Sequence, residues 1–570
     1  MGGKGWLRPQ VLLAMGGLLM LYFGGLGAIP YFEPDEGRYT EIPREMLALK
    51  DFVLPHLNGV LYFEKPPLYY WLNALSIAVF GVSEFSSRFW SATLGLLGLI
   101  PTFALGAKAG SRLTARWAAI ILGTSPLYLA LAHLTIIDMT LTFFFTTTLA
   151  CFYLACEEVK PPRIPWLWYG MFAAAACTVL AKGLIGVALP GAIAFAYLLL
   201  GDRWAVLKKV PWVSGMALFL LMAAPWHILA ALRDPDFLHF YFVREHFLRY
   251  LTTIHARTEP WWFFVPVVLW ALLPWTALLP SSLADLASRT ARGWRLRTTA
   301  SPELFLWLWA GIVVLFFSLS HSKLIPYILP ALPPLAILAA LRVESLTGGR
   351  TAVTPWLRGL LVVALLGVTV FGGAFAMAGL GRVKAFGTPG QVLLPVLLAG
   401  AACAALALLA AGLVSARRWR QALAAMALCS AASFLCIWSV GPTVARVRYT
   451  KDFARYIQQR AQPGEPVFSY RYYPQTLPVY LQRPIGVAAF EGELEFGISN
   501  LPEAERRARF PRPEEFAVLW NSPVRVWCVV DRNSLGKFGP DGLTPPTILM
   551  EEKQVLLVTN RPPEGAGSGS

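Results

Sequence analysis

The chain has 570 residues, of which 56% are hydrophobic and only 14% are charged. A soluble protein would carry about a quarter charged residues, so this composition excludes an ordinary soluble enzyme and indicates a polytopic membrane protein. The formal net charge of +16 does not indicate nucleic-acid binding, because the Lys and Arg residues fall in short loops between apolar runs. Six of the seven Cys residues lie in apolar runs, so we expect neither a disulfide framework nor a Cys-based metal site.

Apolar runs of roughly 20 residues follow one another along most of the chain. We expect about thirteen transmembrane helices, the first of them retained and not cleaved as a signal peptide. Residues 67–82 are also apolar, but this run is short and begins beside Pro66, which favours a helix lying on the membrane surface. The predicted spans are 7–29, 87–107, 113–132, 139–156, 165–181, 184–200, 211–231, 262–281, 302–319, 324–341, 355–379, 390–414 and 421–441.

Loop charge predicts the orientation of these spans. With Lys4 and Arg8 in the cytoplasm, every later basic loop also falls on the cytoplasmic side, as the positive-inside rule requires. If residues 67–82 crossed the membrane, most later loops would change sides and this agreement would be lost. The opposite, extracytoplasmic face then collects residues 31–86, the turn around Asp138, residues 232–261, His321 to Lys323, and everything after about residue 442.

The long apolar runs end at about residue 441, and the sequence after it is more polar. We therefore predict a transmembrane domain over 1–441 and an extracytoplasmic α/β domain over 442–570, which ends in a disordered Gly/Ser-rich tail from Gly565. Its predicted strands are 467–470, 479–481, 524–530 and 554–558, and its predicted helices are 452–460 and 514–520.

Asp35, Glu36 and Arg38 form a charged group directly after the first span. Ionisable residues at a membrane are costly unless they have partners or a function. One carboxylate can act as a base or stabilise charge, while Arg38 can bind a phosphate. The same pattern is also typical of a helix start, with acidic residues in the first turn. Helix start and catalytic site are compatible.

A second charged group, Glu64 and Lys65, precedes two prolines that restrict the backbone. Lys65 can contact a phosphate, and Glu64 can ligate a cation or pair with Lys65. An interfacial turn with a snorkelling lysine is the alternative. Asp138 lies between two apolar spans, where it can serve chemistry or cap the following helix.

Two further loops carry candidate residues on the same predicted face. Lys323 opens a span, and Tyr327 lies one turn deeper. Both can contact an anion, although snorkelling alone can explain the lysine. The segment from Arg244 to Trp262 offers histidines and arginines, among them His246, Arg249, His255 and Arg257, which suit metal ligation or phosphate binding but equally suit a solvated surface cluster. Acidic and cationic groups from five loops thus point to a lipid-linked phosphate.

The order of these motifs resembles the bacterial aminoarabinose transferases of lipid A, which are related to the protein O-mannosyltransferases with the GT-C membrane fold. The resemblance runs from about residue 30 to 340. Its most specific motifs are Glu33 to Tyr39, followed by Arg44-Glu45-Met46, and Tyr62 to Pro67. The C-terminal domain resembles the family in placement and general α/β type. The fold class that this implies is a polytopic GT-C-type helical protein with an extracytoplasmic α/β domain.

The resemblance implies a glycosyltransferase that takes a sugar from undecaprenyl phosphate in the bacterial inner membrane and acts on the periplasmic side as a monomer, with lipid A as the expected acceptor and polymyxin resistance as the consequence. It implies catalytic roles for Asp35, Asp138 and Glu36. It implies donor-phosphate contacts and a divalent metal, Zn, Mg or Mn. The phosphate contacts are Arg38, Lys65, Arg249, Arg257, Lys323 and Tyr327, and the metal ligands are Glu64 with His246 or His255.

The acceptor stays open at this stage, since Ser/Thr hydroxyls of proteins or another glycan are alternatives to lipid A. A flippase for a lipid-linked sugar is an alternative of a different class, and it would predict charged residues in mid-bilayer and inverted repeats. The predicted spans carry almost no charge at their centres, apart from Lys182 near a helix break. A purely structural sensor would leave the convergent charges unexplained. The expected chemistry is a single displacement with inversion.

Overall fold

The computed structural model describes residues 9–158, 164–241, 259–293, 301–348, 354–380 and 390–562. The chain divides into two compact units. A helical unit comprises Met1–Gly24, Glu64–Leu68 and Trp90–Val440, and a second unit combines Gly25–Phe63 and Tyr69–Phe89 with Gly441–Ser570. Helix α4 (Glu84–Leu97) begins in the second unit and ends in the helical unit.

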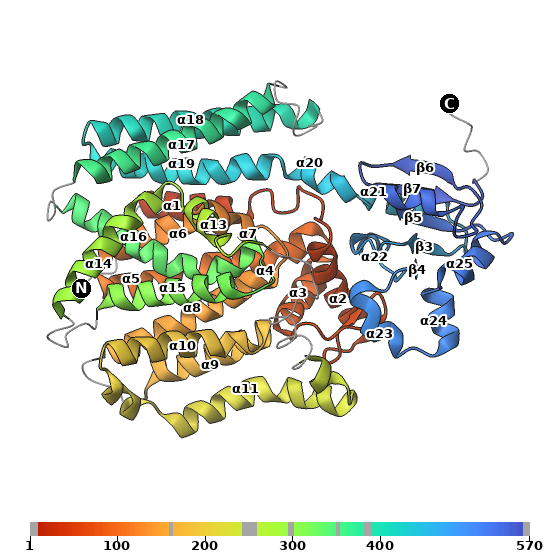
Figure 1. Ribbon diagram of the computed structural model, residues 1–570, viewed down its shortest axis with the longest axis horizontal. Coiled ribbons are helices and arrows are strands. Elements are labelled where there is room, and N and C mark those ends of the chain that lie inside the picture. Colours follow the sequence, from red (N-terminus) through yellow and green to blue (C-terminus); the bar gives the residue numbers. More distant parts are fainter. Residues whose placement is uncertain are drawn as a thin grey trace. The chain divides into compact units, whose positions relative to one another are not determined.

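The helical unit is a bundle of apolar helices (Figure 1). Its described elements are α1 (Pro9–Phe23), α5 (Leu99–Ala109), α6 (Arg112–Thr124), α7 (Pro126–Ala132), α8 (Ile137–Cys156), α9 (Trp166–Lys182), α10 (Ile185–Leu200), η1 (Trp204–Lys209), α11 (Trp212–Arg233), α13 (Phe264–Ala271), η3 (Trp275–Leu278), α14 (Leu279–Gly293), α15 (Pro302–Leu319), η5 (Ile325–Ala331), α16 (Leu332–Thr347), α17 (Pro355–Gly379), α18 (Gly390–Ser415) and α19 (Trp419–Ser439).

Eight helices among the described residues are long and apolar enough to cross a membrane, and there are up to ten if each of two bent helix pairs is one span. The bent pairs are α6 with α7 (62°) and α13 with Trp275–Ser288 (103°). The chain is therefore a multi-pass membrane protein. The three remaining predicted spans contain α1, α9 and α10, of 15, 17 and 16 residues. These helices are shorter than the roughly 20 residues of a full crossing, so the total of thirteen stays a prediction.

The apolar run that we expect to lie on the membrane surface forms helix α3 (Leu68–Phe80). Its 13 residues extend about 20 Å at 1.5 Å per residue, which is less than the roughly 30 Å of a bilayer's hydrocarbon core. A crossing by α3 alone is therefore too short, in agreement with the loop-charge argument. Its orientation at a membrane surface stays a prediction.

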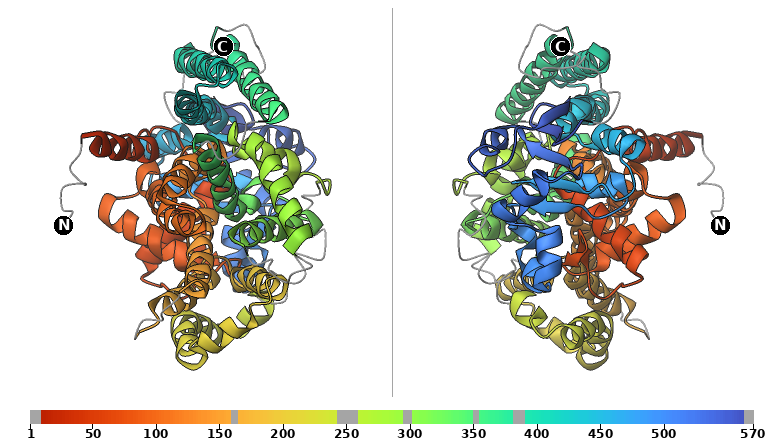
Figure 2. Two further views of the ribbon diagram at one scale, coloured as in Figure 1. Left: turned by 90° about the vertical axis from the view of Figure 1, so that its left-hand side faces the viewer. Right: turned by 90° about the vertical axis from the view of Figure 1, so that its right-hand side faces the viewer.

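Helices α17 and α18 lie side by side at one edge of the helical unit (Figures 1 and 2). Two glycines permit this close packing, because a Cβ atom on Gly372 would lie 2.7 Å from the backbone nitrogen of Ala404, and one on Gly400 would lie 2.3 Å from that of Ala376. Only 22% and 28% of the apolar windows of these two helices are buried, as is expected of helices that face lipid.

The second unit contains a five-stranded mixed sheet with strand order β4-β3-β5-β7-β6. Strand β3 pairs in parallel with β4 and β5, whereas β7 pairs antiparallel with β5 and β6. The strands are β3 (Val467–Tyr470), β4 (Gly486–Ala488), β5 (Trp527–Asp531), β6 (Thr547–Glu551) and β7 (Val555–Thr559). Strands β3, β5 and β7 match predicted strands, whereas β4 and β6 were missed.

One predicted strand is wrong, because residues 479–481 belong to helix α22 (Thr476–Leu481). Leu477, Val479 and Leu481 are all buried, so this short helix is apolar on every side, and periodicity alone does not separate such a helix from a buried strand. The predicted helices 452–460 and 514–520 are confirmed as α21 (Lys451–Arg460) and α25 (Pro513–Trp520). The remaining elements of this unit are α2 (Asp35–Leu49), β1 (His56–Leu57), β2 (Val60–Leu61), α20 (Gly441–Ala445), η7 (Arg446–Arg448), η8 (Gly492–Leu494), α23 (Glu495–Ser499), α24 (Glu503–Arg509) and η9 (Arg532–Lys537).

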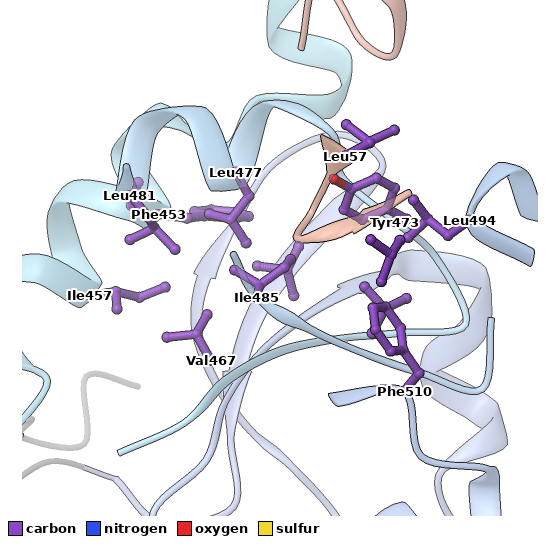
Figure 3. Close-up of a cluster of buried hydrophobic side chains, with 14 of the residues drawn as sticks. Leu57, Phe453, Ile457, Val467, Tyr473, Leu477, Leu481, Ile485, Leu494 and Phe510 are labelled. Carbon is purple, nitrogen blue, oxygen red and sulfur yellow. The ribbon is translucent and has the colours of Figure 1, made fainter. Parts of the chain in front are cut away.

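The loop after the first helix shares a core with the C-terminal sheet. Ile42 and Met46 of α2 and Leu57 of β1 belong to the same buried cluster as α21, α22 and one face of the sheet. Figure 3 shows Leu57 beside Tyr473 and Leu494. A linear boundary at 441/442 therefore does not describe this unit, which is built from both ends of the chain.

Candidate functional site

A fully buried arginine, Arg88, organises the group of candidate residues in the second unit. Its side chain is 0% exposed. A guanidinium has five N–H donors, and here five hydrogen bonds of 2.6–3.0 Å use them, two to the carboxylate of Glu36 and three to the carbonyl oxygens of Leu26, Ile29 and Pro30. Such a buried charge is tolerated because it is paired and hydrogen-bonded. Arg88 thereby fixes the loop that leads into α2.

The carboxylate of Glu36 is as fully engaged as its partner. Oε1 accepts from Arg88 Nε at 2.8 Å, and Oε2 accepts from Arg88 Nη2 at 2.6 Å and from the backbone N–H of Phe32 at 2.9 Å. Glu36 is 2% exposed. A catalytic base must reach the proton that it abstracts, so this geometry favours a positioning role for Glu36 over the catalytic role that the sequence predicts.

The neighbouring carboxylate, Asp35, has the opposite environment. It is the first residue of α2, its side chain is 51% exposed, and one oxygen lies 3.5 Å from Nη1 of Arg38. The helix N-terminus favours an acidic residue here because of the aligned backbone dipoles. Asp35 is thus an accessible carboxylate that projects from a rigidly held helix start.

Arg38 lies between acidic groups of the second unit. Besides Asp35, it approaches Oε1 of Glu493 at 3.6 Å, and its Nε donates to the side-chain oxygen of Gln475 at 3.0 Å. Its side chain is only 11% exposed, and its guanidinium carbon lies 6.0 Å from the centre of the Tyr62 ring. These contacts orient the guanidinium beside the exposed Asp35.

Glu33 connects the same loop to the first turn of α22. It accepts hydrogen bonds from the backbone N–H groups of Gln475 (3.1 Å) and Thr476 (2.7 Å) and from the Thr476 hydroxyl. Burial raises the pKa of Glu33 from 4.5 to about 7, although these hydrogen bonds and the charge of Arg448 act in the opposite direction. The protonation of Glu33 therefore changes near neutral pH.

In the helical unit, Asp138 pairs with Lys182. Asp138 lies in the first turn of α8, Lys182 is the last residue of α9, and the ammonium donates a short hydrogen bond to the carboxylate. The Lys182 nitrogen also lies 4.8 Å from the centre of the Tyr327 ring, in cation–π range. The N-cap residue of α8 is Ile136, so Asp138 acts as an ion-pair partner and not as a helix cap.

Lys323 is buried and bonded to backbone. It is 7% exposed, and its ammonium donates to the carbonyl oxygens of Ser320 (2.6 Å) and Glu259 (2.9 Å). These bonds use two of its three donors and hold the two loops together. The structure thus explains the burial of this cation without an anionic ligand.

Lys65 and Glu64 are half-buried residues of the helical unit. The Lys65 ammonium donates to the backbone carbonyl of Glu64 at 2.8 Å. Of the expected metal ligands, only Glu64 lies among the described residues, because His246 and His255 fall outside them, as do Arg249 and Arg257. Within the described ranges, no three His, Cys, Asp or Glu side chains gather in a way that could hold a metal ion. The metal site therefore stays a prediction.

The structure brings the predicted residues together in two sets. Asp35, Glu36 and Arg38 lie in the second unit, and Asp138 and Tyr327 lie in the helical unit. The sequence analysis missed Arg88 and considered Lys182 only as a helix junction. The signal for both was available, since a cation at the end of an apolar span requires a partner, but the identity of that partner depends on the tertiary fold.

Comparison with known proteins identifies the family. A family model for dolichyl-phosphate-mannose-protein mannosyltransferases matches residues 13–241, and one for the C-terminal domain of aminoarabinose transferases matches residues 453–560. An undecaprenyl phosphate-alpha-4-amino-4-deoxy-L-arabinose arabinosyl transferase of Sodalis glossinidius is 31% identical over 555 residues, which are 94% of each chain. The chain belongs to this family of arabinosyl transferases.

A second member of the arabinosyl transferase family, from Aeromonas salmonicida, is 34% identical over 356 residues. That alignment spans 61% of this chain and 63% of the relative, so it covers less than two thirds of the relative's length. The crystal structure of ArnT from Cupriavidus metallidurans bound to undecaprenyl phosphate has a TM-score of 0.82 and 26% identity, and the match covers 98% of this chain and 99% of ArnT. The predicted fold class, a polytopic GT-C-type membrane protein with a C-terminal α/β domain, is thereby confirmed.

Proposed function

We propose that this protein transfers 4-amino-4-deoxy-L-arabinose from undecaprenyl phosphate to a phosphate group of lipid A. Membership of the arabinosyl transferase family over 94% of the chain supports this activity. The observation that carries the proposal for the site is the accessible carboxylate of Asp35 beside the guanidinium of Arg38. The buried Arg88–Glu36 pair holds this carboxylate at a fixed helix start.

The chemistry of the transfer accounts for this arrangement. When the anomeric carbon of the sugar leaves the lipid phosphate, negative charge grows on the phosphate oxygens, and positive charge develops on the sugar. Cations that face the leaving phosphate lower the barrier, and a carboxylate that faces the sugar stabilises its developing charge. Asp35 suits the second role. An acceptor phosphate is already anionic near neutral pH, so it attacks without prior deprotonation, and the displacement inverts the anomeric centre.

We assign donor-phosphate contacts to Arg38, Lys65 and Tyr327, and we add Lys182 to this set. The ammonium of Lys182 has three N–H donors, and among the described residues it donates only to Asp138. Asp138 then positions the ammonium, and Tyr327 covers it with its ring. Arg249 and Arg257 stay predicted phosphate contacts, and Lys323 is a weaker assignment because backbone carbonyls already bind it.

We infer that the reaction occurs at the periplasmic face of the bacterial inner membrane. Loop charge supports this orientation. The length of α8 fits a full crossing, because its 20 residues extend about 30 Å, the thickness of a bilayer's hydrocarbon core. The Asp138–Lys182 pair lies at one end of α8, and Glu157 pairs with Arg203 just beyond the other end. The accessibility of single cysteines to a membrane-impermeant thiol reagent tests this orientation. A cysteine at the end of α8 that carries Asp138 should be labelled from the periplasm.

A divalent metal at Glu64 is a separate prediction, which the mechanism above does not require. It is tested by metal analysis of the purified protein, with Glu64→Gln as the variant. Bound metal in the native chain and its loss in the variant would support the site.

The transfer itself is tested with purified protein, synthetic undecaprenyl-phosphate aminoarabinose and lipid A. We expect a mass increase of lipid A by one aminoarabinose unit, and loss of this product in Asp35→Asn. Asp452→Asn is a matched control, because Asp452 also lies in the first turn of a helix and pairs with the arginine three residues later. Glycosylation of a peptide hydroxyl instead of lipid A, or passage of the intact donor across a vesicle membrane without product, would contradict the proposal.

A further inference from the structure

The helical unit contains an apolar cavity that takes no part in the proposed reaction. It lies between α8, α9, α10, η1 and α11, and its volume is about 350 Å³. This is within the roughly 300–1,000 Å³ of ligand pockets in proteins. Phe152, Trp168, Phe172 and Leu198 contribute to its apolar lining. The one hydroxyl in the lining, on Thr148, already donates to the carbonyl oxygen of Phe144 in its own helix. The cavity therefore suits a hydrocarbon chain and not a polar metabolite.

The cavity is bordered by side chains of the outer surface of the unit. Phe195, Trp212 and Met216 line it and are 57%, 49% and 43% exposed. Gly191 lines it as well, and a Cβ atom placed on Gly191 would have no other atom within 4 Å. Helices α8 and α11 beside the cavity are long and apolar enough to cross a membrane, so we expect these exposed apolar side chains to face lipid and a chain from the bilayer to enter beside Gly191.

The position along the helices places the cavity far from the Asp138–Lys182 pair. Its lining residues on α8, Thr148 to Phe152, follow Asp138 by 10 to 14 residues, which is about 15–21 Å along the helix axis. Trp204 and Trp212, which also line it, begin η1 and α11. Tryptophan at helix ends is typical of the membrane interface. Figure 1 shows α9, α10 and α11 running side by side in this region.

Two lysines lie at the same end. Lys208 and Lys209 are exposed residues of η1, and the residues on either side of them, Leu207 and Val210, line the cavity. Among the described residues, neither lysine forms an ion pair, whereas the nearby Arg203 is paired with Glu157. An apolar cavity at this end of the helices is thus combined with two cations that no described residue neutralises.

We propose that this cavity binds one acyl chain of an anionic glycerophospholipid, and that Lys208 and Lys209 bind the phosphate of its head group. The lipid comes from the leaflet at this end of the bundle, which is the cytoplasmic leaflet in the predicted topology. Anionic lipids are attracted to lysines near the membrane surface by a free energy that corresponds to about fivefold in affinity per lysine. The polyprenyl donor is a different ligand, since its phosphate is assigned to the opposite end of α8.

Native mass spectrometry of the detergent-purified full chain tests this site, with dioleoyl phosphatidylglycerol titrated against dioleoyl phosphatidylcholine. We expect one molecule of phosphatidylglycerol to bind in preference. Lys208→Ala/Lys209→Ala should weaken that binding by on the order of 30-fold and remove the preference. Gly191→Leu should block binding of both lipids, because it adds a bulky apolar side chain at a lining position where a Cβ atom meets no other atom within 4 Å.

Two control variants match these changes elsewhere in the bundle. Gly367→Leu adds the same side chain on α17, where a Cβ atom also meets nothing within 4 Å. Arg418→Ala/Arg420→Ala removes two exposed cations near the start of α19. Neither control should alter lipid binding. Equal binding of the two lipids by the native chain, or unchanged binding in Gly191→Leu, would overturn the proposal. Displacement of the bound lipid by undecaprenyl phosphate would also overturn it, because the cavity would then belong to the donor.

Discussion

The two ion pairs of the candidate site differ in how completely their charges are used. The Arg88–Glu36 pair is buried at 0% and 2% exposure, and all five guanidinium donors have acceptors. The Asp138–Lys182 pair is 14–15% exposed, and the ammonium donates one hydrogen bond among the described residues. The first pair therefore has no capacity for a ligand, whereas the second retains two donors.

This difference distinguishes an ion pair that supports the fold from an ion pair that can bind a ligand. A saturated, buried pair stabilises one conformation of the loop before α2, and its loss leaves an uncompensated charge. A pair with spare donors can accept an anionic group without breaking its own contact. The adjacent residues Asp35 and Glu36 show the same division within a single turn, since one carboxylate is half exposed and the other is enclosed.

The largest effect is expected for Arg88→Ala. It leaves the Glu36 carboxylate buried without a partner and releases three backbone carbonyl oxygens. We expect a loss of about 3–5 kcal/mol in the free energy of unfolding, together with loss of transfer. Thermal unfolding in detergent measures the loss of stability. Arg455→Ala is the matched control, because that exposed arginine also pairs with a carboxylate in the same unit. Equal stability of the two variants would contradict a supporting role for Arg88.

Asp35→Asn should separate activity from stability. The side chain is half exposed and its contact with Arg38 is 3.5 Å long, so the melting temperature should change little. Transfer should fall by on the order of 10²–10³-fold, the usual loss when one group that stabilises charge in the transition state is removed. Steady-state kinetics on lipid A measures this, and donor binding should persist. Full activity of Asp35→Asn would remove Asp35 from the catalytic role.

Substitutions of Asp138 and Lys182 test whether the second pair binds the donor. Lys182→Gln should raise KM for the donor by on the order of tenfold with a smaller change in kcat, because one phosphate contact is lost. A double-mutant cycle with Asp138→Asn should give a coupling energy between the two residues. Arg203→Gln breaks the comparable pair with Glu157 beyond the other end of α8 and should leave KM unchanged. An equal rise in KM for Arg203→Gln would show that Lys182 acts through stability alone.

The last effect concerns the stability of the fold, through Glu33 and pH. Its pKa is raised from 4.5 in the unfolded chain to about 7 in the folded state, so the folded state binds the proton more tightly. The contribution is favourable at low pH and is lost as the pH rises to about 7. Between pH 5 and 8, the free energy of unfolding of the native chain should therefore fall by on the order of 2 kcal/mol more than that of Glu33→Gln. Chemical unfolding at each pH measures this difference.

The control for this pH effect is Glu503→Gln. The arginines beside Glu503 lower its pKa to about 2, so its ionisation does not change between pH 5 and 8. Its pH profile should therefore follow that of the native chain. A parallel profile for Glu33→Gln as well would show that Glu33 does not titrate in this range.

Much of the architecture was predictable from local pattern. The apolar runs identified the membrane helices, and α2, α21 and α25 began within one residue or a few of the predicted positions. Helix α22 was mistaken for a strand because it is buried on all sides. The predicted boundary at 441/442 does not place residues 25–63 in the same unit as the C-terminal sheet, to which they belong. Local composition does not reveal that two distant segments share a core.

By itself, the sequence determined the membrane class and the residue types that a lipid-phosphate transferase needs, and its loop charge predicted an orientation. These features follow from solvation, because apolar runs and charged loops partition in the same way whatever the fold. Only the tertiary structure decided which charges are partners. Arg88 lies 52 residues after Glu36, and Lys182 lies 44 residues after Asp138. Whether a carboxylate is enclosed or free depends on such distant contacts, and these distinguish Glu36 as support from Asp35 as the accessible group.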